Sequence, residues 1–260
     1  MRTSRRFMLT VCLLLFAVTS LSFAADAPAP GKQVASSAVG NQVAASVTIK
    51  WKGDEGEKET TPRFLLALPA DYEKNANQKW PLVLFLHGSG ERGDDLEIVK
   101  KHGPPKLVSE GKSFPFVVVS PQCPKDSRWN PHELAKLVDH LANTYRIDRQ
   151  RLYVTGLSMG GGGTWSLVSE YPKLFAAAIP ICGRGDLANV PKFAKLPIWI
   201  FIGAKDKAET VLNCEQMAAE IKKAGGEGKL RVYPDLEHDC WTVTYENPEI
   251  YTWLLSHRAP

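Results

Sequence analysis

The sequence lacks the patterns by which metal sites and nucleic-acid surfaces are recognised. No C-x-x-C or H-E-x-x-H spacing occurs among its five cysteines and six histidines, so we expect neither a metal site nor a cofactor. The formal net charge of +4 includes three arginines and no acidic residue within the first 24 positions, so the rest of the chain carries +1. A nearly neutral chain has no basic surface for nucleic acid, and none is expected as a partner.

Long hydrophobic runs are also lacking. An apolar run near the N-terminus, from Phe7 to Val18, is shorter than the roughly 20 residues that cross a bilayer. Arginines precede it and small residues follow it up to Ala24, which is the pattern of a secretory signal peptide. We therefore predict a signal peptide over residues 1–24, cleavage near Ala24, and a secreted or periplasmic protein without stable membrane association. A transmembrane anchor is the alternative interpretation.

Cysteine is scarce, and its state depends on the compartment. Cys12 lies in the predicted signal peptide, which leaves Cys123, Cys182, Cys214 and Cys240 in the mature chain. In an oxidising compartment four cysteines allow three disulfide pairings, and the sequence does not choose among them. Four buried thiols are the alternative, because Cys214 falls on the apolar face of a predicted helix.

The remaining composition is typical of one globular domain. Residues 25–44, rich in Ala, Pro, Ser and Gly, predict a flexible leader, so we place the folded domain at residues 45–260. An alternating segment at 46–51, a charged turn at 53–61 and an apolar segment at 63–69 predict an antiparallel hairpin at a sheet edge.

Continuous apolar runs of strand length then alternate with segments of helical character. The predicted strands are 81–86, 116–120, 151–155, 175–180, 198–203 and 230–233, and the predicted helices are 131–145, 158–170, 209–224 and 248–256. This alternation predicts an α/β fold, with a mostly parallel sheet of about eight strands and helices on both faces. Ligands bind such sheets at the carboxyl ends of the strands, where His87, Ser158, Asp206 and His238 all lie.

One stretch, residues 154–163, combines a strand end, the pentapeptide G-L-S-M-G and a run of glycines. The pattern G-x-S-x-G between a strand and a helix is typical of a nucleophile elbow. A serine hydroxyl is a weak nucleophile that must be held beside a base, and a sharp corner does this. Gly156 and Gly160 allow the corner and let the helix pass close to the strand. We therefore predict that Ser158 is a catalytic nucleophile.

A base and an acid follow in the required order. His238 comes after the last predicted strand and is the candidate base for Ser158, against the alternative of an ordinary loop histidine. We expect His87, next to a glycine loop, to brace that loop instead. Asp206 follows a buried strand and lies between Ser158 and His238 in the chain, so it is the candidate acid. Asp186 is its main rival, and a solvated loop aspartate is the alternative for Asp206 itself.

An acyl-transfer site also needs donors for the oxyanion of its tetrahedral intermediate. One expected donor is the backbone N–H of Met159, directly after the nucleophile. The other is the N–H of Ser89, in the glycine loop of residues 87–90 that follows a buried strand. A plain turn is the alternative for this loop.

Several motifs resemble those of secreted α/β-hydrolase esterases. The similar group contains polyhydroxybutyrate depolymerases, feruloyl esterases and predicted peptidases, and the resemblance covers the chain from about residue 46 onward. Dienelactone hydrolases resemble this chain less, because they have a cysteine where Ser158 stands. The motifs that carry the resemblance are H-G-S-G-E-R-G at 87–93, S-P-Q-C-P at 120–124, G-L-S-M-G-G at 156–161, G-A-K-D at 203–206 and H-D-C-W at 238–241.

The resemblance implies a catalytic triad of Ser158, Asp206 and His238 and makes Trp129 and Trp241 candidates for the wall of a substrate pocket. Core packing is the alternative for Trp241. The intervals between the predicted elements are short, which leaves little chain for a cap over the site.

The main hypothesis is a serine hydrolase that cleaves carboxylic esters through an acyl-enzyme on Ser158. Its substrate would be a small-molecule or polysaccharide-linked ester, as secretion and the resembled group suggest. A serine peptidase of the prolyl-oligopeptidase type is the alternative, since it uses the same triad. A non-catalytic binding protein on a hydrolase fold is the third possibility. The sequence says nothing of the oligomeric state.

Overall fold

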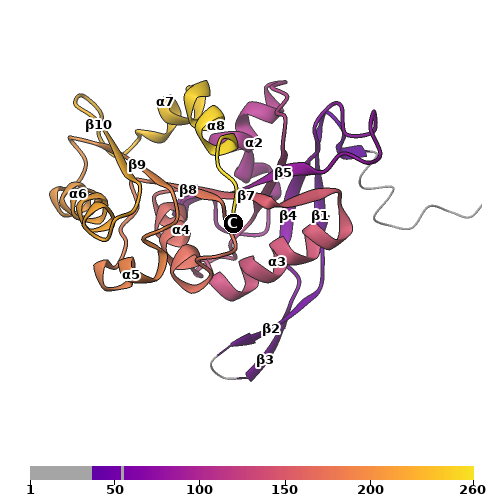
Figure 1. The fold of residues 1–260 in the computed structure, drawn as a ribbon. Helices are drawn as coiled ribbons and strands as arrows, with labels where there is room; N and C mark the ends of the chain where they lie inside the picture. Colours follow the sequence, from indigo (N-terminus) through magenta and orange to yellow (C-terminus); the bar gives the residue numbers. More distant parts are fainter. Residues whose placement is uncertain (1–36, 54–55) are drawn as a thin grey trace, which may run out of the picture.

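An eight-stranded sheet forms the centre of the molecule in the computed structural model, which describes residues 37–53 and 56–260 (Figure 1). β4 pairs antiparallel with both β1 and β6, and every other pair of neighbours is parallel. In spatial order the strands are β1 (Gln42–Ser46), β4 (Arg63–Ala67), β6 (Val117–Pro121), β5 (Trp80–Leu86), β7 (Ile147–Leu157), β8 (Ala177–Ile181), β9 (Ile198–Gly203) and β10 (Gly228–Tyr233). The predicted α/β class and strand number are confirmed.

The central strands are continuous apolar runs because helices cover them on both faces. All seven residues of β5 and all six of β9 are buried. The register aligns Leu86 at the end of β5 with Gly156 in β7, and Leu157 with Ile181 in β8. The carboxyl ends of these three strands therefore meet at one edge of the sheet, directly beside Ser158.

Helices form a layer on each face of the sheet (Figure 1). One layer contains α3 (Pro131–Thr144), α4 (Met159–Glu170) and α5 (Val190–Phe193), and the other contains α2 (Gly103–Ser109), α7 (Trp241–Glu246) and α8 (Pro248–Leu255). α6 (Ala208–Lys223) packs on β9 and β10 and contacts α5. The connecting 3-10 turns are η1 (Ser89–Glu91), η2 (Leu96–Lys101) and η3 (Leu187–Asn189).

The N-terminal hairpin differs from the prediction. The expected strand at 46–51 is divided between β1, which ends at Ser46, and β2 (Ile49–Gly53). β1 is the edge strand of the main sheet, whereas β2 pairs with β3 (Gly56–Thr60) in a separate two-stranded sheet that extends from the body (Figure 1). The charged segment predicted as a turn therefore contains a strand. Trp51 anchors this hairpin by stacking on His132 of α3, with ring centroids 5.8 Å apart.

The structured part of the chain begins earlier than the predicted boundary at residue 45. Ala38 is completely buried in the core, and β1 starts at Gln42. β1 consists mainly of small residues and is held in the sheet by backbone pairing. A composition rich in alanine and serine does not reveal a strand of this kind. The predicted signal peptide and most of the predicted leader lie outside the described residues. Within the described part of the chain, no helix combines the length and apolar character needed to cross a bilayer.

Candidate active site

Ser158 lies at a sharp corner between β7 and α4. Its backbone has φ 52° and ψ −114°, a conformation that a non-glycine residue adopts only where the surroundings enforce it. The corner is tight on both sides: a Cβ on Gly156 would lie 2.3 Å from the carbonyl oxygen of Gly160, and a Cβ on Gly160 would lie 1.9 Å from that of Leu86. Side chains at either position would collide with backbone, so the G-x-S-x-G spacing is a steric requirement here.

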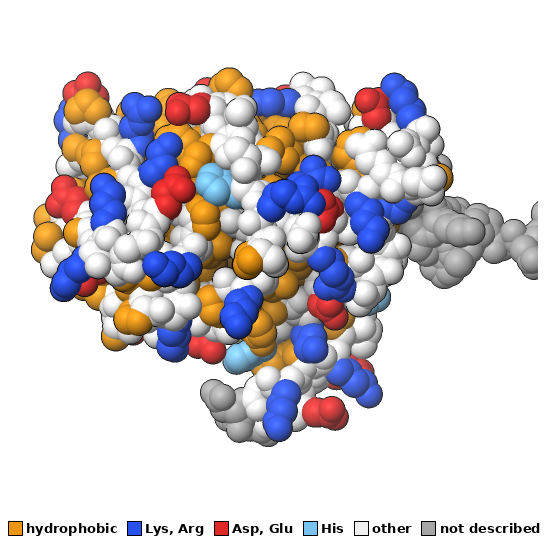
Figure 2. All heavy atoms as spheres, viewed as in Figure 1, with side chains coloured by type: hydrophobic (Ala, Val, Ile, Leu, Met, Phe, Trp, Pro, Cys, Tyr) orange, Lys and Arg blue, Asp and Glu red, His pale blue; other side chains and the backbone are white. Residues whose placement is uncertain are grey.

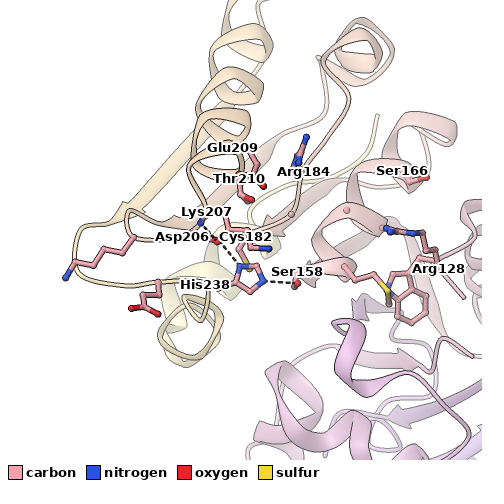
Figure 3. A pocket seen from close by; sticks show the side chains of 17 residues that line it. Arg128, Ser158, Ser166, Cys182, Arg184, Asp206, Lys207, Glu209, Thr210 and His238 are labelled. Carbon is pink, nitrogen blue, oxygen red and sulfur yellow. Dashed lines mark hydrogen bonds and ion pairs between the residues drawn. The ribbon is translucent and has the colours of Figure 1, made fainter. Parts of the chain in front are cut away.

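Ser158, His238 and Asp206 form a continuous hydrogen-bonded series (Figure 3). The Oγ of Ser158 is 2.9 Å from Nε2 of His238, and Nδ1 of His238 is 2.7 Å from Oδ2 of Asp206. Since the carboxylate can only accept, Nδ1 carries the proton and Nε2 is left to accept the serine hydroxyl. The Asp206 side chain is 1% exposed and the His238 side chain 47% exposed, so the acid is shielded while the imidazole reaches solvent.

Asp206 and His238 lie on two neighbouring loops. Asp206 follows β9, and its carboxylate also accepts the N–H of Lys207 at 2.6 Å. The N–H of Lys205 donates to the carbonyl of Leu236 in the His238 loop at 2.9 Å. Gly203 permits this approach, because a Cβ there would lie 2.1 Å from the carbonyl oxygen of Glu237. Backbone contacts between the loops therefore set the distance between the acid and the imidazole.

A buried cysteine lies beneath this series. The Sγ of Cys182 falls within 4.8 Å of ligand atoms of Asp206 and His238. Cys182 also has a positive φ of 42°, and its thiol hydrogen-bonds that of Cys240. Burial, followed by the Cys240 thiol, raises the pKa of Cys182 far above its usual range, so it is a neutral thiol rather than a nucleophile. Cys182, Asp206 and His238 are close enough together to hold a metal ion. Their ligand atoms, however, already form hydrogen bonds within the protein.

All four described cysteines are free and buried, as the second sequence alternative proposed. Burial raises the pKa of Cys123 to about 11 and that of Cys214 to about 12. These thiols are packing groups in the structure as it stands.

The glycine loop after β5 passes beside the nucleophile. A Cβ on Gly88 would lie 3.7 Å from that of Ser158. Ser89 and Met159 are the first residues of η1 and α4, positions at which a backbone N–H has no acceptor within its own helix. Met159 lines the pocket at Ser158, whereas Ser89 is not among the lining residues. Both amides are thus available as donors, with Met159 the better placed.

His87 holds this loop in position. Its Nδ1 donates to the carbonyl of Gly88 at 2.6 Å, and its Nε2 accepts the N–H of Cys123 at 3.0 Å. The second bond requires the neutral ring, because a protonated Nε2 cannot accept. Burial, the largest cause, lowers the pKa of His87 to about 4, so the ring stays neutral at physiological pH. This arrangement agrees with the bracing role expected from the sequence.

The two candidate pocket tryptophans occupy different places. Trp129 lines the pocket, and its Nε1 donates to the carbonyl of His87 at 3.1 Å. Trp241 is not among the lining residues. Instead it packs edge-to-face on His238 at 5.3 Å and donates to Nδ1 of His102 at 3.3 Å. Trp129 thus lines the pocket beside Ser158, whereas Trp241 packs against His238 outside that lining.

An open pocket of about 840 Å³ lies at Ser158 (Figure 3). Besides Ser158, Met159 and His238, it is lined by residues from the loops after β6, β8, β9 and β10 and from α4 and α6. On the face shown in Figure 2, lysine and arginine side chains are interspersed with acidic ones. The pocket is of a size that holds a small-molecule ligand or a sugar unit.

Comparison with known proteins finds hydrolases similar to this chain. A model of the dienelactone hydrolase family matches residues 125–246, although the motifs had indicated a weaker resemblance to that family because of the serine at position 158. The chain is 27% identical over 184 residues to a bifunctional acetylxylan esterase/xylanase of Neocallimastix patriciarum, covering 66% of this chain and 26% of that protein. It is 32% identical over 120 residues to poly(3-hydroxyalkanoate) depolymerase C of Paucimonas lemoignei, covering 40% and 28%. A solved thermostable esterase aligns with a TM-score of 0.66 at 33% identity, covering 82% of this chain and 63% of that one.

The chain has the α/β-hydrolase fold. The resemblance inferred from its motifs is confirmed at this level, and a ferulic acid esterase structure shares the fold at 18% identity with a TM-score of 0.56. This α/β-hydrolase spans only about a quarter of the length of the first two curated relatives that it matches, 26% and 28%.

Sequence reasoning missed three residues of this α/β-hydrolase site. Cys182 lies under the acid and the imidazole, and Arg128 and Arg184 line the pocket. Cys182 directly follows a buried strand, which was an available signal. The two arginines lie in loops and carry no pattern that distinguishes them from other surface arginines.

Proposed function

We propose that this α/β-hydrolase is a serine hydrolase that cleaves carboxylic esters, with Ser158, His238 and Asp206 as its catalytic triad. The observation that carries the proposal is the hydrogen-bonded series of 2.9 Å and 2.7 Å at the open pocket. Esterases among the relatives and structural neighbours support the reaction class.

In the first half of the reaction, Nε2 of His238 accepts the proton of the Ser158 hydroxyl as Oγ attacks the ester carbonyl carbon. The N–H groups of Met159 and Ser89 stabilise the oxyanion that forms. The intermediate collapses by breaking the bond to the alcohol oxygen, and His238 protonates the departing alcohol. Asp206 remains ionised and stabilises the imidazolium.

In the second half, water replaces the alcohol. His238 takes a proton from the water as its oxygen attacks the acyl carbon of the Ser158 ester. The second intermediate collapses, the acid leaves, and the proton returns to Oγ of Ser158. The exposed His238 ring and the open pocket give water direct access for this step.

Polysaccharide-linked esters are the substrate class that we favour. Relatives whose names include acetylxylan esterase and feruloyl esterase support this choice. Together with the predicted signal peptide at residues 1–24, they lead us to propose an enzyme that acts outside the cytoplasm.

The proposal is tested with wild type, Ser158→Ala and a control variant, Ser109→Ala, which removes an exposed hydroxyl outside the pocket lining. Wild type and the control should hydrolyse p-nitrophenyl acetate and react with a fluorophosphonate probe, whereas Ser158→Ala should do neither while keeping its folded circular dichroism spectrum. Labelling of Ser158→Ala at the wild-type level would refute the assignment. An aminoacyl-proline p-nitroanilide tests the peptidase alternative, and complete lack of labelling of wild type would favour a binding protein.

A further inference from the structure

The pocket at Ser158 contains basic side chains that the proposed reaction does not use. Asp206 accepts hydrogen bonds from His238 and from the N–H of Lys207, and Lys205 is paired with Asp235 at 3.6 Å. The remaining lining has two arginines and one lysine against Asp206 and two glutamates, so these charges balance in number and the placement of each arginine decides what it can bind. The charged lining residues are Arg128, Arg184, Lys205, Lys207, Asp206, Glu209 and Glu237.

The two arginines of the pocket differ from all other arginines in the described part of the chain. Seven of these nine arginines have a hydrogen bond or an ion pair to a protein group. They are Arg63, Arg92, Arg146, Arg149, Arg151, Arg231 and Arg258. The side chains of Arg128 and Arg184 have no such partner among the described residues, and both line the pocket that contains Ser158.

Arg128 and Arg184 approach the pocket from different parts of the fold. Arg128 lies in the loop between β6 and α3, next to Trp129, and Arg184 lies in the loop after β8. In Figure 3, Arg128 is to the right of Ser158, Arg184 is above it and His238 is to the left. Both arginines thus line the same pocket as Ser158, on sides of it that differ from that of the imidazole in this view.

A guanidinium group presents its N–H donors in a planar fork that matches a carboxylate. Glu209 and Glu237 in the same lining lower the positive potential, which favours a singly charged carboxylate over a doubly charged phosphate. Trp129, beside Arg128, adds an aromatic surface that suits the apolar face of a sugar ring or an acyl chain.

We propose that Arg128 and Arg184 form an anionic subsite and that the enzyme prefers esters carrying a carboxylate near the scissile bond. This proposal rests on the proposed esterase function. The carboxylate has two possible sources: a uronic-acid unit on the alcohol side, as in an acidic polysaccharide, or the free end of a dicarboxylic acid on the acyl side.

Matched substrate pairs test the subsite and distinguish the two sources. The alcohol pair is acetylated oligogalacturonate against acetylated xylo-oligosaccharide, with acetate release as the readout. The acyl pair is mono-p-nitrophenyl adipate against its methyl ester, with nitrophenol release as the readout. We expect kcat/KM to favour the charged member of one pair by roughly tenfold, the size of one good charge-assisted interaction. This preference should weaken in 0.5 M salt.

Arg128→Gln and Arg184→Gln should each reduce the ratio of charged to neutral kcat/KM several-fold. The matched control is Arg149→Gln, which removes an arginine paired with Asp139 at 2.9 Å and should leave the ratio unchanged. Equal kcat/KM for both members of both pairs would overturn the subsite while leaving the esterase intact. So would a ratio that the pocket variants do not alter.

A binding measurement separates failure of the subsite from failure of the esterase. Calorimetric titration of Ser158→Ala with oligogalacturonate and with monomethyl adipate should detect weaker binding when Arg128→Gln is added. If wild type cleaves no ester but this arginine-dependent binding occurs, the esterase proposal fails and the anionic site stands. If neither acid binds and no charge preference occurs, the subsite is refuted.

Discussion

The two sides of Ser158 differ sharply in packing. On the sheet side, a Cβ on Gly156 or Gly160 would lie 2.3 Å or 1.9 Å from a backbone oxygen, so the corner has no room for a side chain at either position. On the pocket side, Arg128 and Arg184 are exposed and have no partner among the described residues. The sheet side should therefore determine the stability of the corner, and the pocket side should determine which substrates react. Variants on each side test this division when stability and kcat/KM are both measured.

The largest expected effect is on rate, at the junction of the two sides. In Asp206→Asn, the amide can donate to Nδ1 of His238, which leaves the proton on Nε2 and prevents that nitrogen from accepting the serine proton. We expect kcat/KM for p-nitrophenyl acetate to fall about 10⁴-fold, as the wrong imidazole tautomer implies. The free energy of unfolding, measured by urea denaturation, should change little by comparison.

The control for this variant is Asp186→Asn, which alters the rival acid considered from the sequence. The Asp186 carboxylate caps η3 by accepting the N–H of Ala188 at 3.0 Å. Its removal should leave kcat/KM within about twofold. A loss of activity in Asp186→Asn comparable to that in Asp206→Asn would contradict the assignment of the acid.

On the sheet side, Gly160→Ala should cost stability. Its Cβ would lie 1.9 Å from the carbonyl oxygen of Leu86, and backbone cannot move aside as a flexible side chain can. We expect the free energy of unfolding to fall by about 3 kcal/mol or more, the upper range for overpacking. Urea denaturation of the purified variant measures the loss, and poor soluble yield would have the same cause.

Gly162→Ala is the matched control, two residues further along α4. The nearest atom to its Cβ would be the carbonyl oxygen of Arg184 at 3.8 Å, an ordinary contact. Because alanine favours a helix over glycine, this change should stabilise the protein by up to about 1 kcal/mol. Equal destabilisation by the two variants would show that the close approach at Gly160 is not what requires glycine.

The same packing explains which parts of the fold the sequence could predict. The buried strands β5, β8 and β9 are continuous apolar runs because both of their faces are covered, so their positions followed from composition alone. β1 is held by backbone pairing at the sheet edge, and its small residues carry no comparable signal. The helix α2 begins Gly-Pro-Pro, which interrupts any apolar periodicity.

For the candidate site, order along the chain and strand ends sufficed to select Ser158, Asp206 and His238, which the structure brings within hydrogen-bonding distance. Whether Trp241 faces the pocket or packs behind His238 depends on the direction of α7, which no local pattern specifies. The absence of partners for Arg128 and Arg184 likewise depends on every loop around them. Tertiary placement, not residue type, decides these features.

A smaller effect concerns pH. Folded His87 has a pKa of about 4 against the ordinary 6.5, chiefly because burial penalises the charged ring. Below pH 6.5 the unfolded chain binds a proton that the folded chain excludes, so stability is fully present above pH 6.5 and declines as the pH falls toward 4. Between pH 7 and 5 this single group should cost about 2 kcal/mol.

Urea denaturation at both pH values in wild type and His87→Gln measures this contribution, since glutamine can still accept the Cys123 N–H but does not titrate. The difference in stability between pH 7 and 5 should shrink by about 2 kcal/mol in the variant. His140→Gln, which changes a partly exposed histidine on α3, should leave the difference as in wild type. An unaltered pH dependence in His87→Gln would mean that the loop opens when the histidine is protonated.

The smallest expected effect is a loss of stability without a change in kcat/KM. The hydroxyl of Tyr245 is fully buried and lies 3.0 Å from Oγ1 of Thr155, which itself donates to the carbonyl of Ile179 at 2.8 Å. Tyr245→Phe keeps the ring but removes one buried hydrogen bond, so the free energy of unfolding should fall by about 1 kcal/mol. Tyr233→Phe is the control, because Tyr233 is itself partly exposed and its partner Thr244 also donates to the carbonyl of Cys240. If the sheet side governs stability alone, kcat/KM stays within about twofold in both variants. A tenfold loss of kcat/KM in Tyr245→Phe would show that packing beneath β7 reaches the geometry of Ser158 and that the two sides are coupled.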